Sequence, residues 1–331
     1  MTMLWQGVGA DLGFFSTKFT SGADDYASFD SVVGYGARSM VDESNDHLLF
    51  ADGATVGQAA IRFATDLRRL KDDNWITSAE ISRLFRAGVA SLAGIDSQNL
   101  FCVTALPINL FKFSRGKLAF HLDGTHEFSM ACGRDVNFTA RIKEIPQAFA
   151  CLCDQFLTAH GLIYNKLALE KVGVIDIGGR DVNVLVSDGF RTADALSDTY
   201  HDGVWTLVER LRGVLAADFD RPSLTEYETE RALRSGVLAH QGEAVDISAT
   251  IDKMSTEYVA KIMARVRSLW GDELNSMKRI FLTGGGALLF GDKLLHELPR
   301  QTEIVTDAIQ SNANGACKYA KFLLAREGAT A

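Results

Sequence analysis

The stretch VIDIGGRDVNVLV, residues Val174–Val186, decides the fold. An apolar run ends in Asp176, two glycines follow, and a second alternating apolar run begins shortly after them. A buried strand gains nothing from a carboxylate, because burying a charge is costly unless the charge is paired. The stretch therefore predicts a strand, a glycine turn with a chemical role, and a second strand.

The same arrangement occurs near the start of the chain, in GVGADLGFFSTKF (Gly7–Phe19). Asp11 and Asp176 lie 165 positions apart in a chain of 331 residues, so the repeat divides the chain into halves. This spacing predicts two halves of similar plan that face each other, with the aspartates where the halves meet.

Bulk composition bounds the class of protein. The chain is long enough for two domains or one large α/β domain, and its 47% hydrophobic and 23% charged residues are typical of a soluble globular protein. A net charge of −8 argues against a nucleic-acid surface. No apolar run approaches the roughly 18 residues needed to span a bilayer. The five cysteines form no even framework, which predicts free thiols in a reducing compartment and a cytoplasmic location.

The pattern alternates between strands and helices, and no Pro/Ser-rich linker interrupts it. Apolar spacing predicts a helix over residues 57–70 and another over 77–94, capped by Thr77 or Ser78. A third helix is predicted to open at Pro146 and close at Gly161. Residues 312–327 form the predicted closing helix.

Glycine turns suggest the chemistry. A turn rich in glycine exposes several backbone N–H groups, and such a nest attracts anionic oxygens. Two facing turns could bind a polyphosphate between them, with Lys18 beside the first turn. Asp11 and Asp176 would then be placed to hold Mg²⁺, mainly through its water ligands. Each aspartate taken alone is more often a turn residue, and the pairing favours the functional interpretation.

A third glycine cluster, LTGGGALLF (Leu282–Phe290), follows a predicted strand and opens a predicted helix. It matches neither the dinucleotide fingerprint nor the P-loop. A turn of this kind admits a ribose-bearing ligand close to the backbone at a helix N-terminus.

The order of these three motifs resembles that of the actin, sugar-kinase and heat-shock-chaperone ATPase superfamily. The corresponding segments are Gly9–Phe19, Val174–Val186 and Ile280–Leu288, and KEIPQAFACL (143–152) and SNANGACKYAKF (311–322) resemble its two connecting helices. Within the superfamily the chain looks most like the ParM-like bacterial and archaeal actins. The resemblance implies an α/β, actin-like fold: two similar RNase H-like domains around a nucleotide cleft. Domain I would span 1–165 with the helix 315–331 packed back onto it, and domain II would span 166–314.

The resemblance also implies residue roles. Asp11 and Asp176 would organise Mg²⁺ and water, and Lys18 would contact a phosphate. Gln147 would orient the attacking water, with Glu144 as the alternative and the only true base of the two. The β- and γ-phosphates would be cradled by Leu12, Gly13, Phe14, Phe15, Gly178, Gly179 and Arg180. The adenosine would lie near Gly284, Gly285, Gly286, Glu230 and Arg231, where the last two alternatively form an ordinary solvated helix face.

Arg180 departs from the small hydroxyl residues usual in the family, and it would either reach a phosphate or face solvent. The predicted function is that of an ATPase that polymerises with ATP and Mg²⁺ and disassembles after hydrolysis. The filament would position plasmid or other DNA through a DNA-binding adaptor, with no direct nucleic-acid or membrane contact. Whether GTP competes with ATP stays open. The alternatives are a non-filamentous phosphotransferase of the sugar- or acetate-kinase type and a nucleotide-binding scaffold without turnover. Candidate subunit contacts, each also a candidate core residue, are Phe14, Phe15, Phe111, Phe113 and Trp270.

Overall fold

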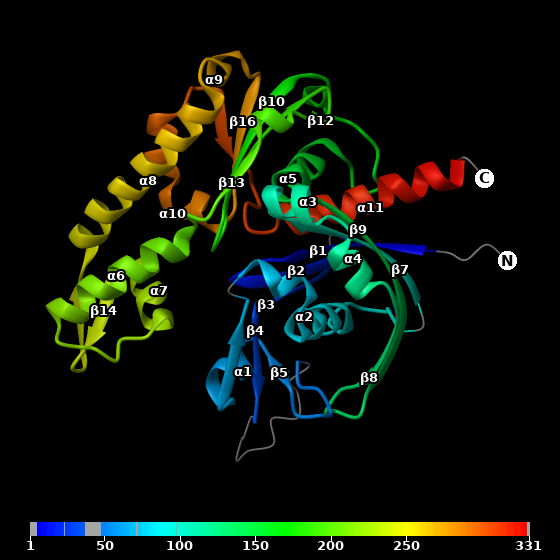
Figure 1. Cartoon of the computed structure of the whole chain (residues 1–331), viewed down its shortest axis with the longest axis horizontal. Helices are drawn as coiled ribbons and strands as arrows, with labels where there is room; N and C mark the ends of the chain where they lie inside the picture. The colour runs from blue at the N-terminus through cyan, green and yellow to red at the C-terminus, as the bar shows by residue number, and fades with distance from the viewer. Residues whose placement is uncertain (1–4, 23, 37–47, 71, 97, 330–331) are drawn as a thin grey trace. The chain divides into compact units, whose positions relative to one another are not determined.

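The computed structural model describes residues 5–22, 24–36, 48–70, 72–96 and 98–329. The chain forms two compact units (Figure 1). Unit 1 comprises Met1–Leu169 and Gln310–Ala331, and unit 2 comprises Glu170–Ile309. The predicted domain boundaries at 165/166 and 314/315 lie a few residues from these divisions.

Unit 1 contains a six-stranded sheet of order β3-β2-β1-β7-β9-β8 and a small sheet of order β5-β4-β6. β1 pairs antiparallel with β2 and parallel with β7. The strands are β1 (Trp5–Leu12), β2 (Ser16–Gly22), β3 (Asp25–Asp30), β4 (Val32–Tyr35), β5 (Thr55–Val56), β6 (Asp66–Arg69), β7 (Gln98–Leu106), β8 (Gly124–Ser129) and β9 (Asp135–Pro146). The helices are α1 (Gln58–Phe63), α2 (Ala79–Ala90), α3 (Ile108–Ser114), α4 (Lys117–Leu122), α5 (Gln147–Phe156) and α11 (Ser311–Ala329).

Helices cover both faces of the β1–β2 pair. Side chains alternate between the faces of a strand, so Gly9 and its neighbour Ala10 point to opposite sides. Phe19, the register partner of Ala10, packs against α2 at Gly88. On the other face a Cβ at Gly9 would lie 2.1 Å from the carbonyl oxygen of Ala313, so only glycine admits α11 this close. Figure 1 shows α11 in red beside α5, which it also contacts.

Unit 2 repeats the plan with a sheet of order β12-β11-β10-β16-β17, in which β13 also pairs with β11. β10 pairs antiparallel with β11 and parallel with β16, as β1 does with β2 and β7. The strands are β10 (Lys171–Ile177), β11 (Val182–Asp188), β12 (Arg191–Thr192), β13 (Asp198–Tyr200), β14 (Val237–His240), β15 (Glu243–Asp246), β16 (Arg279–Thr283) and β17 (Thr302–Ile304). The helices are α6 (Val204–Asp218), α7 (Glu226–Ser235), α8 (Ser248–Trp270), α9 (Glu273–Ser276) and α10 (Gly285–Glu297).

Trp270 belongs to the core of unit 2. Its side chain is 1% exposed, and its indole Nε1 donates a hydrogen bond to the carbonyl of Leu196 (3.0 Å). A Cβ at Gly173 would press against the indole ring, so the glycine makes room for it. The prediction of Trp270 as a subunit contact is therefore wrong, and its alternative, a core position, holds.

Two helix predictions are also partly wrong. The helix predicted over 57–70 stops at Phe63, because Leu67 and its neighbours pair with β4 as strand β6. The helix predicted over 146–161 ends at Phe156, since Leu157 bridges Ile163 instead. Helix starts were predicted better. Ser78 accepts a hydrogen bond from the backbone of Ile81 and so confirms one of the two predicted caps of α2.

Candidate functional site

The first glycine turn joins β1 to β2 and is held from behind by Ser31. The Gly13 carbonyl accepts a hydrogen bond from the Ser31 hydroxyl, and the Phe15 carbonyl accepts one from the Ser31 backbone N–H (2.9 Å). The peptide bonds of this turn are trans, so each N–H points opposite to the carbonyl before it. The N–H groups of Phe14 and Ser16 therefore point away from Ser31. One of these donors, Phe14, belongs to the predicted Leu12–Phe15 segment, and the other, Ser16, follows it directly.

A buried ion pair stands beside this turn. Asp11 and Lys18 are register partners in β1 and β2, and Lys18 Nζ lies 2.9 Å from Asp11 Oδ2. The two residues are only 4% and 7% exposed. Asp11 Oδ1 is buried and has no hydrogen-bond partner among the described residues. Because buried carboxylate oxygens are normally satisfied, this atom marks a place for a water or a cation.

The second glycine turn joins β10 to β11 and is fixed by a segment far along the chain. Three consecutive carbonyls accept backbone hydrogen bonds: Gly178 from Val204 (3.1 Å), Gly179 from Trp205 (2.8 Å) and Arg180 from Gly203 (2.8 Å). With trans peptides, the N–H groups of residues 179–181 must point away from residues 203–205. Three successive N–H groups aimed to one side form an anion-binding nest.

Gly203 makes this contact sterically feasible. A Cβ at this position would lie 2.4 Å from the backbone of both Gly179 and Arg180, so a larger residue would push the two segments apart. The preceding residue fixes the segment to α8. The Asp202 carboxylate pairs with Lys261 (2.6 Å) and Arg265 (2.9 Å), and its carbonyl accepts from the Tyr258 hydroxyl (2.8 Å). Burial alone would raise the pKa of Asp202, but hydrogen bonds and charges from these cations outweigh burial and lower it.

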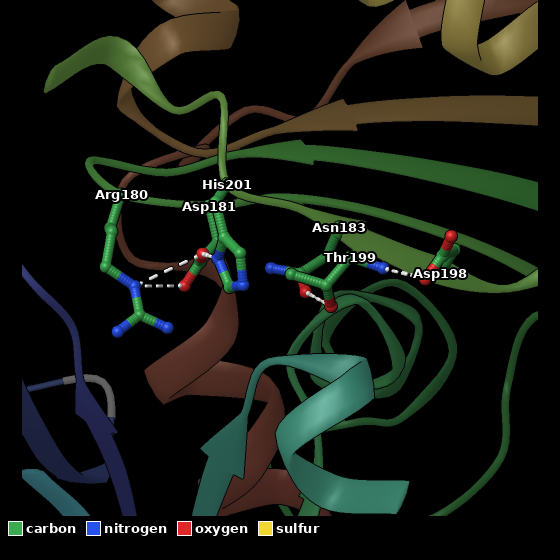
Figure 2. A network of polar contacts seen from close by, with 6 residues as sticks. All are labelled: Arg180, Asp181, Asn183, Asp198, Thr199 and His201. Atoms are coloured by element: carbon green, nitrogen blue, oxygen red, sulfur yellow. Dashed lines mark hydrogen bonds and ion pairs between the residues drawn. The ribbon is translucent and has the colours of Figure 1, made fainter. Parts of the chain in front are cut away.

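Arg180 does not extend into solvent. Figure 2 shows its side chain turned toward Asp181, with Nε at 3.2 and 3.1 Å from the two carboxylate oxygens. His201 Nδ1 lies 2.6 Å from Asp181 Oδ1, on the other side of the same carboxylate. The Arg180 side chain is 13% exposed. Asp181 therefore holds an arginine in a fixed place at the second turn.

Asp176 and the triple glycine lie at adjacent strand ends in unit 2. β10 and β16 are parallel neighbours in which Asp176 pairs in register with Thr283. Gly284 has a φ of +83°, and a Cβ there would lie 2.6 Å from Asp176 Oδ1 and 2.4 Å from the Ile177 carbonyl oxygen. Gly286, in the first turn of α10, packs equally closely on Ile177. The glycines therefore bring the N-terminus of α10 directly against the Asp176 carboxylate.

A pocket of about 380 Å³ lies on α7. Its lining residues are Tyr227, Glu230, Arg231, Arg234 and Ser235. Glu230 pairs with Arg234 one helical turn on (2.8 Å), which leaves the neighbouring Arg231 with no ion pair in the described part of the chain. Pockets of this size hold small ligands. The predicted pair Glu230 and Arg231 therefore lines an open pocket on the surface of α7, and the Glu230–Arg234 pair also fits the alternative of an ordinary helix face.

The two candidates for orienting water differ in their surroundings. Gln147 is the first residue of α5, directly after the N-cap residue Pro146, as the motif predicts. Glu144 is 4% exposed, and its carboxylate oxygens accept hydrogen bonds from the backbone N–H groups of Gly116 (2.5 Å) and Ala119 (2.9 Å). Glu144 thus caps the start of α4. A carboxylate engaged on both oxygens is poorly placed to take a proton from water, so the geometry argues against Glu144 as the base.

Some neighbours of the two glycine turns were not predicted from the sequence. Ser31 and Gly203 hydrogen bond to the turns and His201 contacts Asp181 beside the second one, yet none of them stands in a glycine motif. The only local signal was the Asp-Gly pair that precedes α6, which is an ordinary turn signal.

The carboxylates fit Mg²⁺ and do not form a closed metal site. Within the described residues no three His, Cys, Asp or Glu side chains converge as a metal site. Mg²⁺ is usually held by one or two carboxylates with waters and substrate phosphates, and the unpartnered Asp11 Oδ1 suits this mode. None of the helices in the described ranges has the length and apolarity to cross a membrane.

Comparisons with known proteins agree with this geometry. Residues 9–149 match the family model of the actin like proteins N-terminal domain, and residues 174–296 match that of the archaeal actin homologue MreB-like C-terminal domain. The fold and its paired turns thus define an actin-like protein. More narrowly, the two models together cover most of the chain, which belongs with the actin-like proteins and matches the archaeal actin homologues in its C-terminal part. A search of curated proteins with the sequence finds no significant match.

Solved structures of such proteins share the whole fold. A non-polymerisable quadruple mutant of pCBH ParM superimposes with a TM-score of 0.79 at 20% identity, covering 95% of this chain and 98% of its own. A 15-stranded ParM filament from Clostridium botulinum gives 0.81 at 18%, covering 96% and 99%. The archaeal actin homologue Ta0583 in complex with ADP gives 0.78 at 19%, covering 95% and 98%. At these identities the likeness establishes the actin-like fold.

Proposed function

We propose that this chain is an ATPase that assembles into filaments with Mg-ATP and disassembles after hydrolysis. The observation that carries the proposal is the second turn, where three successive N–H groups are forced to one side by hydrogen bonds behind them. Such a nest binds phosphate oxygens without needing a P-loop. The first turn presents donors in the same way, and we expect it to bind phosphate oxygens of the nucleotide as well.

The base and ribose would be held in unit 2. The close approach of α10 to Asp176 leaves backbone N–H groups of Gly285 and Gly286 at a helix N-terminus, where a ribose or phosphate oxygen is favoured. The α7 pocket would take the purine, with Arg231 as a donor for its ring nitrogens. ADP in the Ta0583 structure supports a nucleotide ligand. We expect ATP to be preferred, with GTP as the competitor to test.

Mg²⁺ would be held by Asp11 and Asp176 through its waters. When bound, it would neutralise charge on the β- and γ-phosphates. Lys18 would hold Asp11 in place and contact a phosphate oxygen. Gln147 would orient the attacking water by hydrogen bonding without accepting its proton, as amides do in other phosphoryl-transfer sites. Arg180, fixed by Asp181, would add a positive charge at the second turn.

We further propose that the filaments position plasmid or other DNA in the cytoplasm through an adaptor protein. The net charge of −8 supports indirect contact, because phosphate backbones are bound by basic surfaces. A non-filamentous phosphotransferase remains the alternative, and it would show ATP turnover that depends on an added acceptor.

The proposal is tested by sedimentation and phosphate release with Mg-ATP. The wild-type chain should pellet with ATP and release phosphate without an added acceptor. Asp176→Ala should keep the fold and lose nearly all phosphate release, since losing the metal ligand removes several kcal/mol of transition-state stabilisation. Asp188→Ala, an exposed aspartate at the end of the neighbouring strand, is the matched control and should behave as wild type. Wild-type turnover in Asp176→Ala would remove this residue from the site.

A further inference from the structure

Two large aromatic side chains project from the short helices of unit 1. Phe113 in α3 is 83% exposed and Phe120 in α4 is 89% exposed. Both helices pack on β9 (Figure 1) through their other sides. The residues that face inward are almost fully buried: Ile108, Leu110, Leu118 and Leu122. A helix of a soluble protein normally carries polar residues on its outer side, so two exposed phenylalanines so close in sequence indicate a binding surface.

The same segment, residues 108–122, is basic. It contains Lys112, Arg115 and Lys117 and no aspartate or glutamate, in a chain whose net charge is −8. Unit 2 has the opposite character, with 16 lysines and arginines against 23 aspartates and glutamates, a net charge of −7. Unit 1 carries 18 against 19, a net charge of −1. The acidity of the chain is therefore concentrated in unit 2.

The segment 108–122 is held in shape before any partner binds. Glu144 caps α4, and the Arg115 guanidinium lies 5.3 Å from the centre of the Phe111 ring. His121 Nε2 lies 2.9 Å from the Ser82 hydroxyl, which ties α4 to α2. A surface that is already ordered loses less entropy on binding, which favours a specific protein contact.

We propose that the segment 108–122 binds the acidic unit 2 of a second copy of this chain. The inference rests on the filament proposed above and names one of its contact surfaces. Aromatic side chains and arginine are enriched at protein interfaces, and the opposite charges would steer the encounter of the two copies. A contact between two different surfaces of the same chain is heterologous, and it propagates into a filament when its rotation does not close into a ring.

Two pairs of variants test this surface. Phe113→Ser/Phe120→Ser removes the aromatic contacts, and Leu169→Ser, at a 79% exposed leucine elsewhere in unit 1, is its control. Lys117→Glu reverses one charge, and Arg62→Glu makes the same change on the exposed side of α1. With Mg-ATP, both test variants should raise the critical concentration for pelleting at least tenfold, while both controls match wild type. Thermal melts should show all four variants folded.

The possible results separate this surface from the filament itself. If wild type and both test variants pellet alike, the surface is wrong and the filament stands. If wild type never pellets, the proposed filament fails, and sedimentation velocity without nucleotide decides the surface. Self-association that is lost in Lys117→Glu would then support it, and identical monomers would overturn it. Binding of wild type, but not of Lys117→Glu, to vesicles containing phosphatidylglycerol, with unchanged assembly, would assign the segment to lipid instead.

Discussion

Lys18→Met tests the buried ion pair that supports the first turn. The substitution leaves the Asp11 carboxylate 4% exposed with no cation beside it, and its Oδ1 already lacks a partner among the described residues. Removing one partner of a buried pair typically costs about 3–5 kcal/mol, because the remaining charge is uncompensated. Unit 1 comprises 191 residues, a size at which each kcal/mol shifts Tm by roughly 2–4 °C. We therefore expect unit 1 to melt about 6–20 °C lower.

Hydrogen exchange of the β1 and β2 peptides measures this loss within unit 1, which a whole-chain melt would average with unit 2. The double variant Asp11→Asn/Lys18→Met removes both charges and should be more stable than Lys18→Met alone. Lys143→Met makes the same chemical change at a half-buried position of β9 and should stay within about 0.5 kcal/mol of wild type. Unchanged protection of β1 in Lys18→Met, or a double variant less stable than the single one, would refute the account of an uncompensated charge.

Three further predictions concern the site and the core. Gln147→Ala should bind ATP normally and hydrolyse it about 10–100-fold more slowly, which corresponds to about 1.4–2.7 kcal/mol in activation free energy. Light scattering after ATP addition should then rise and fail to decay. Glu144→Ala should instead lose stability, and equal decay in both variants and wild type would contradict the proposed mechanism. Gly284→Ala should lower the free energy of unfolding by about 2–5 kcal/mol, because of the positive φ and the clash with the turn, and it should abolish nucleotide binding. Gly213→Ala, in a helix with open space around it, is the control and should be neutral or stabilising. Burial lowers the pKa of His126, so below about pH 6.5 the unfolded state binds more protons than the folded state. The free energy of unfolding should therefore decrease as the pH is lowered below that value. His126→Phe should flatten that dependence in urea titrations, and an unchanged slope would exclude His126 as its source.

Local patterns predicted the elements that carry their own signal. The runs ending in Asp11 and Asp176, each followed by glycine, gave both strand-turn-strand units, because apolar alternation and turn residues are properties of the segment itself. The capping serine of α2 was predictable for the same reason. Leu67 was placed in a helix because its spacing fits one, but pairing with β4 across more than thirty residues overrides that preference.

The residues of the candidate site were also predictable only in part. The glycines and aspartates of the turns are visible in the sequence, since their chemistry is unusual for a strand end. Ser31 and Gly203 are not visible, because each acts through hydrogen bonds to a turn many residues away. The capping role of Glu144 depends on where α4 starts, and that position is set by tertiary packing and not by the residues around Glu144.

The docking of α11 has a consequence for biosynthesis. α11 covers one face of β1 at Gly9, and a Cβ at Gly315 would lie 1.7 Å from the carbonyl oxygen of Ala150 in α5, so this helix completes the interior of unit 1. The ribosome makes it only after all of Glu170–Ile309. Unit 1 therefore cannot complete its interior until all of unit 2 has been synthesised, and one side of its central strand stays uncovered until this helix docks.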